Sequence, residues 1–74
     1  MVIITKNEIV PLDDRCIYVD RGLLVIESEI NSRYVKNIPD NAIQQIAVAF
    51  AENKNYLEFE DAELVFEEGE EDDA

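Results

Sequence analysis

The chain has 74 residues, of which 18 are acidic, six are basic and none is histidine, so its formal net charge is −12. A domain of this length buries only about 60% of the surface that its unfolded chain exposes. Because there is one cysteine and no histidine, the sequence excludes an intramolecular disulfide, a Cys/His zinc site and a Ser-His or Cys-His nucleophilic pair. Nucleic acids and anionic lipids are polyanions that bind Lys and Arg, so the charge also argues against direct binding to either.

Two features bear on where the protein works. The first residues lack the basic start, the long apolar stretch and the cleavage site of a secretory signal. The longest unbroken apolar run, residues 46–51, is far shorter than the roughly 20 residues that a membrane helix requires. We therefore expect a cytoplasmic protein that does not bind a membrane.

The first residues also carry a pattern typical of β-structure. Residues 2–5 are rich in β-branched side chains and predict a short strand. Residues 9–11 are apolar as well, but Pro11 cannot donate to a central ladder. We expect this second segment to form a connection.

A hairpin is the clearest predicted element. Residues 16–19 and 23–26 flank a three-residue loop, residues 20–22, whose Gly22 suits a left-handed conformation. This loop length sets the register, because side chains directly opposite each other share a face. It places Val19 opposite Leu23 and Ile17 opposite Val25, and it leaves Cys16, Tyr18, Leu24 and Ile26 on the other face.

Both faces of that hairpin are apolar, and one helix covers only one of them. We therefore predict a homodimer whose two-fold interface buries the uncovered face. The alternative is that residues 2–5, or the segment around Ile9, fold over this face within one chain. The predicted dimer interface consists of Ile17, Val19, Leu23 and Val25.

Residues 39–53 predict the single helix. Pro39 and Asp40 suit its first turn, and Asn53 suits the left-handed residue that ends a helix. Val48 lies on the polar side, either as an isolated exposed valine or as part of a second contact surface. Four apolar residues recur at helical spacing and form the expected buried stripe, namely Ile43, Ile46, Ala47 and Phe50.

The last patterned segment, residues 56–66, alternates as a strand does, but with a slip in phase. Leu57 and Phe59 share one side, and the apolar residues that follow share a side only if Glu60 and Asp61 form a bulge or a turn. A bulged strand or a tight hairpin is favoured. A helix from Asp61 onward is the alternative.

These elements predict one α+β domain over residues 1–66. It should contain a small antiparallel sheet of three to five strands, including a short strand at residues 33–36, with one helix packed on one face. Residues 67–74 are expected to form a flexible acidic tail, because they offer nothing to bury before the last alanine.

The negative charge is concentrated at one end of the chain. Residues 57–74 hold ten of the 18 carboxylates and no Lys or Arg, so eight acids and six bases remain elsewhere. Carboxylates two residues apart on a strand are separated by about 6.6 to 6.8 Å, similar to successive phosphates along one nucleic-acid strand. Charges this close repel one another unless a cationic partner is bound. The predicted partner-binding residues are Glu58, Glu60, Asp61, Glu63 and Glu67, followed by Glu68, Glu70 and Glu71 in the tail.

In composition, residues 58–73 resemble small acidic DNA-mimic proteins, often phage-encoded, which share charge and purpose but no common fold or motif. The resemblance implies a non-enzymatic inhibitor that occupies the basic surface of a cytosolic DNA-binding protein, such as a nucleoid-associated protein, a nuclease or a transcription component. The alternatives are a homo-oligomeric assembly module whose acidity only confers solubility, and an antitoxin-like neutraliser of a basic toxin. We predict no catalytic residue, cofactor or metal site, because the acidic tail lacks the EF-hand pattern and so small a domain offers little cleft.

Overall fold

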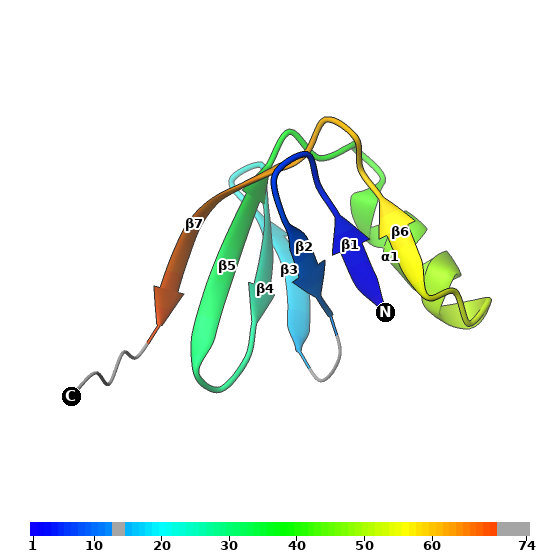
Figure 1. Cartoon of the computed structure of the whole chain (residues 1–74), viewed down its shortest axis with the longest axis horizontal. Coiled ribbons are helices and arrows are strands. Elements are labelled where there is room, and N and C mark those ends of the chain that lie inside the picture. The colour runs from blue at the N-terminus through cyan, green and yellow to red at the C-terminus, as the bar shows by residue number, and fades with distance from the viewer. Residues whose placement is uncertain (13–14, 70–74) are drawn as a thin grey trace.

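The structure, a computed structural model, describes residues 1–12 and 15–69. Within these residues the chain forms seven strands and one helix, arranged as a three-stranded and a four-stranded sheet (Figure 1). The predicted α+β class is confirmed. The strands form two sheets where one was predicted, and their pairing is mostly antiparallel.

The three-stranded sheet has the order β2-β1-β6. Strand β1 (Val2–Ile4) lies in its centre, antiparallel to β2 (Ile9–Pro11) and parallel to β6 (Tyr56–Glu58). Residues 9–11 thus form an edge strand, and the prediction of a connection is wrong. Pro11 is tolerated there because an edge strand has one side on which no ladder donor is needed.

The four-stranded sheet has the order β3-β4-β5-β7. Its strands are β3 (Cys16–Asp20), β4 (Leu23–Glu27), β5 (Asn31–Lys36) and β7 (Glu63–Gly69). The segment that includes residues 33–36 is therefore a strand, as predicted. Strand β7 extends through Gly69, so residues 67–69 belong to the sheet, whereas the sequence assigned them to the tail; residues 70–74 lie outside the described residues.

The register predicted for the β3–β4 hairpin is wrong by one residue. Its loop contains two residues, Arg21 and Gly22, and both have positive φ, +56° and +79°. A loop of this kind matches the twist of the flanking strands, and it brings Asp20 opposite Leu23. Ile17 and Val19 therefore share one face, while Leu23 and Val25 lie on the other.

The corrected register divides the predicted dimer interface between two faces. Ile17 and Val19 lie on the face of Leu24 and Ile26, which points into the protein. Val25 belongs to the outer face, yet only 1% of it is exposed. It lies in a row across the sheet, Tyr18–Val25–Tyr34–Phe66, in which the rings of Tyr34 and Phe66 are 5.4 Å apart.

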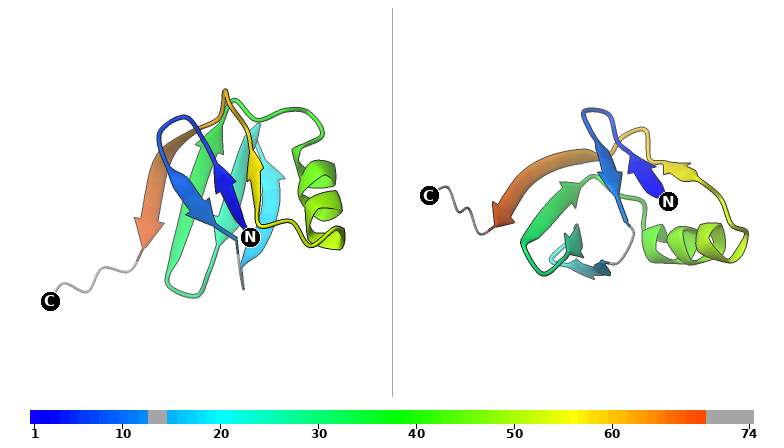
Figure 2. Two further views of the ribbon diagram at one scale, coloured as in Figure 1. Left: turned by 45° about the vertical axis from the view of Figure 1, so that its right-hand side comes forward. Right: turned by 60° about the horizontal axis from the view of Figure 1, so that its bottom comes forward.

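The core lies between the two sheets. Ile3 and Val10 of the three-stranded sheet are fully buried together with Leu24, Ile26 and Val35 of the four-stranded sheet. Figure 2 shows the strands β1, β2 and β6 lying across one face of the larger sheet. The inner face of the hairpin is thus covered within one chain, the alternative to the dimer that the sequence left open.

The helix α1 (Ala42–Ala51) contacts β3 and β6 at the side of the two sheets (Figure 2). It ends as predicted, since Asn53 has φ +58° and donates its N–H to the carbonyl of Phe50 at 3.1 Å. The predicted buried stripe is correct only at Ile46. The residues that face the core are Ala42, Ile46 and Ala49, whereas Ile43, Ala47 and Phe50 are exposed.

The last segment contains a turn at Glu60 and Asp61, as predicted, and continues as a strand. Strands β6 and β7 do not pair with each other, because the turn passes the chain from one sheet to the other. A register shift in β7, opposite Tyr34 and Val35, then places Phe66 on the outer face and Leu64 on the inner face.

Gly22 gives a direct test of the two-residue hairpin loop. Gly22→Ala should lower the free energy of unfolding by roughly 1–2 kcal/mol, because a Cβ disfavours φ +79°, although nothing lies within 4 Å of that position. Urea unfolding measures this change. Arg21→Asn is the matched control and should be neutral or stabilising, because Asn tolerates the left-handed conformation that Arg21 also adopts. Equal urea midpoints for the wild-type protein and Gly22→Ala would contradict the positive φ of Gly22 in the two-residue loop.

Candidate functional site

The structure separates the carboxylates that the sequence placed in one row. Glu58 ends β6, Glu60 and Asp61 lie in the turn, and the later acidic residues belong to β7 in the other sheet. The predicted partner-binding carboxylates therefore do not lie on one strand. Two of the predicted partner-binding residues, Glu70 and Glu71, lie outside the described residues.

The carboxylates of β7 are bound to neighbouring side chains of the same protein. Glu63 lies 3.9 Å from Lys6 and 3.8 Å from Lys36, measured from carboxylate oxygen to Nζ. Glu67 accepts hydrogen bonds from Nε of Arg33 at 3.2 Å and from Nδ2 of Asn31 at 3.1 Å. Glu68 accepts a hydrogen bond from the hydroxyl of Tyr34 at 3.3 Å. These contacts tie β7 to its neighbours. Basic side chains partly neutralise the charges of Glu63 and Glu67.

Glu58, Glu60 and Asp61 form a different group, which we call the turn carboxylates. All three are exposed, and in the part of the chain that the structure describes none of them has a hydrogen-bond or ion-pair partner on a side chain. The turn that presents them is fixed on both sides, because Phe59 and Ala62 are buried and the N–H of Ala62 donates to the carbonyl of Phe59 at 3.0 Å. The turn carboxylates thus hold three neighbouring negative charges on an ordered support.

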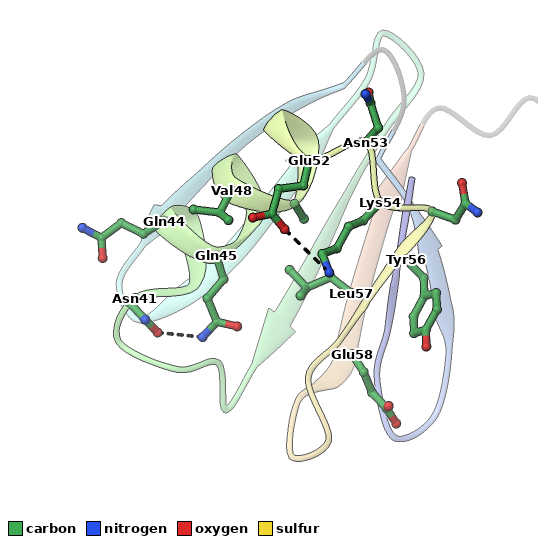
Figure 3. Close-up of a pocket in the computed structure, with 12 residues that line it drawn as sticks. Asn41, Gln44, Gln45, Val48, Glu52, Asn53, Lys54, Tyr56, Leu57 and Glu58 are labelled. Atoms are coloured by element: carbon green, nitrogen blue, oxygen red, sulfur yellow. Dashed lines mark hydrogen bonds and ion pairs between the residues drawn. The ribbon is translucent and has the colours of Figure 1, made fainter.

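A groove of about 720 Å³ lies next to the turn carboxylates, between α1 and β6. Figure 3 shows Gln45, Val48 and Glu52 on the helix side of this groove. The other wall comes from β6 and the loop before it. Its residues include Lys54, which pairs with Glu52 at 3.7 Å, and Leu57.

A second hollow, of about 350 Å³, lies beside the groove. It shares Gln45 and Glu58 with the groove, and it is also lined by Glu60 and Asp61. The turn carboxylates therefore line one or both of these hollows. Sequence reasoning missed the groove, and its one signal was Val48, which is 54% exposed and lines it.

The described residues offer little other chemistry. Within residues 1–12 and 15–69, no three Cys, Asp or Glu side chains converge as metal ligands, and the helix is too short to cross a membrane. The pKa of the Tyr18 phenol is raised above its ordinary value, first by partial desolvation and then by the carboxylate of Glu27, to which its hydroxyl donates a hydrogen bond at 3.2 Å. This tyrosine lies on the outer face of the larger sheet, away from the groove.

Comparisons of the chain with models of protein families, with curated proteins and with solved structures found no match.

The two groups of carboxylates should differ in their effect on stability. Glu58→Gln with Glu60→Gln should leave the free energy of unfolding unchanged or raise it, because the change relieves repulsion between free charges. Glu63→Gln should lower it by up to about 1 kcal/mol, because two lysines lose their shared partner at a partly exposed position. Urea unfolding at low and high salt measures both changes, and the difference should shrink as salt screens the charges. Equal destabilisation by both variants would contradict this division.

Proposed function

We propose that this protein is a non-enzymatic inhibitor that occupies the basic surface of a DNA-binding protein in the way that DNA does. The observation that carries the proposal is the group of turn carboxylates, Glu58, Glu60 and Asp61, which are exposed beside the groove and have no basic partner among residues 1–12 and 15–69. Keeping three like charges together costs stability in a small domain, and a cationic partner offsets that cost. A basic toxin in place of the DNA-binding protein would use the same surface.

The net charge of −12 supports the same proposal over a longer range. Long-range attraction between opposite charges raises the rate of encounter, while groups in the contact mainly set the rate of dissociation. The turn carboxylates are positioned by an ordered turn and serve the contact. The remaining acidic surface serves the encounter.

The first test of this function is displacement of DNA. Proteins from the source cell that are retained on the immobilised chain and eluted by a salt gradient are purified and loaded with fluorescent duplex DNA. Adding the acidic protein should release the DNA, and Glu58→Gln with Glu60→Gln should release it less well, with faster dissociation of the protein complex. Asp20→Asn with Glu29→Gln is the control, because it removes the same charge from exposed positions near the larger sheet.

Two results would contradict the proposal. The first is a shift of duplex DNA by the acidic protein alone in the absence of divalent cations, because two polyanions do not associate without bridging cations. The second is equal release of DNA by the turn variant and its control. In that case the turn carboxylates do not form the contact with the partner.

A homo-oligomeric assembly module is the second candidate function, and one surface favours it. Ile43, Ala47 and Phe50 form a single exposed stripe on α1, in which Ile43 is 40% and Phe50 44% exposed. Apolar stripes of this kind are typical of helix-mediated association. This stripe replaces the hairpin face as the surface that a second copy would bury.

Sedimentation equilibrium at micromolar concentration tests this second candidate. A dimer through the stripe predicts twice the mass of one chain, and Phe50→Ser should return the mass to that of a monomer without unfolding the domain. Phe66→Ser is the control, since Phe66 is also exposed but lies on the outer face of the four-stranded sheet. If the wild-type protein has the mass of a single chain, the dimer is excluded.

A further inference from the structure

The outer edge of β6 presents unpaired backbone groups. On its inner edge, β6 is bound to β1: Val2 donates its N–H to the carbonyl of Asn55 at 3.2 Å, and Phe59 donates its N–H to the carbonyl of Ile4 at 2.9 Å. In a parallel ladder alternate residues bond to the same neighbour, so the backbone groups of Tyr56 and Glu58 point the other way. No strand in residues 1–12 or 15–69 pairs with that side of β6.

Natural proteins usually protect such an edge with a lysine, a proline, a bulge or a covering element, because it accepts any further strand. Here the edge consists of Tyr56, Leu57 and Glu58, and it opens into the groove beside α1. The helix runs along the groove and leaves a volume of about 720 Å³ unfilled. An exposed strand edge that borders a groove is the kind of surface to which an extended peptide adds as a further strand.

We propose that an extended basic segment of the partner adds to β6 as a further strand and lies in the groove against α1. The basic character of this segment rests on the function proposed above, and the mode of binding does not. Backbone hydrogen bonds would run to Tyr56 and Glu58. Successive side chains of a strand point to opposite faces, so one set contacts Val48 and Leu57 while the other lies beside the turn carboxylates.

The charges around the groove favour a basic segment over other occupants. The groove and the adjoining hollow are lined by four acidic residues, Glu52, Glu58, Glu60 and Asp61. Their single basic residue, Lys54, is already paired with Glu52 at 3.7 Å. A second copy of this chain would bring a further charge of −12 to the same place, so like-charge repulsion opposes pairing of β6 with itself. The partner segment that fits this site therefore alternates basic and apolar side chains.

A proline at Glu58 separates strand addition from simple charge attraction. The probe is a blocked peptide of alternating Lys and Val, eight residues long, and its affinity is measured by fluorescence anisotropy. Glu58→Pro removes one edge N–H and leaves the ladder to β1 intact, because the N–H of Glu58 does not take part in it. We expect the affinity to fall at least tenfold. The matched control Glu58→Gln removes the charge and keeps the N–H, and it should weaken binding only about two- to fivefold.

A second measurement does not depend on the fold of a variant. Two isomeric probes carry N-methyl groups on all Val or on all Lys residues, which blocks opposite edges of an extended strand. One isomer should bind wild-type protein as the parent peptide does, and the other should bind at least tenfold more weakly. On addition of the parent peptide, the amide protons of Tyr56 and Glu58 should become protected from hydrogen exchange.

The outcomes distinguish the two proposals. Equal affinities of Glu58→Pro and Glu58→Gln, or of the two N-methylated isomers, would overturn strand addition and leave charge attraction in place. The same holds if the protein without peptide were a dimer in which the amide protons of Tyr56 and Glu58 are already protected from hydrogen exchange. Displacement of DNA without strand addition would preserve the function proposed above, whereas strand addition without displacement of DNA would preserve only the binding mode.

Discussion

The parallel pairing of β1 with β6 is the interaction on which the rest of this structure depends. It joins the first strand to a segment near the other end of the chain, and with β2 it completes the layer that buries the inner face of the four-stranded sheet. The side chain of Asn7 strengthens the closure, because it donates to the carbonyl of Leu64 at 3.1 Å and accepts from the N–H of the same residue at 3.0 Å. The same pairing leaves the outer edge of β6 open beside α1.

Features encoded by neighbouring residues could be predicted from the sequence, and features encoded by distant contacts could not. The helix stop at Asn53 and the turn at Glu60 depend on local conformation and were predicted correctly. The predicted hairpin register was wrong because Arg21 adopts φ +56°, which shortens the loop. Arginine has no special preference for positive φ, so the sequence did not indicate this conformation. The two separate sheets were not predicted, because nothing near Val2 in the sequence indicates its pairing with Tyr56.

The helix shows why an apolar pattern alone does not identify the buried side. Residues 42–51 are apolar except for two glutamines, so two stripes are available at helical spacing. The structure buries the stripe of Ala42, Ile46 and Ala49, on the side of the helix that contacts β3 and β6. The bulkier stripe with Phe50 was the stronger prediction on hydrophobicity.

The carboxylates of this chain fall into two groups, and the difference between them is the basis of the function that we propose. Glu63 and Glu67 pair with lysine and arginine side chains on neighbouring segments, so their charge contributes to the cohesion of the four-stranded sheet. The turn carboxylates have no such partners in the described part of the chain, and they stand where β6 ends. In the binding mode that we propose, a basic segment drawn to them would arrive at an open backbone edge, where hydrogen bonds are short-ranged and directional while the charge attraction is neither. Charge would then select the partner, and the edge of β6 would fix its direction and register.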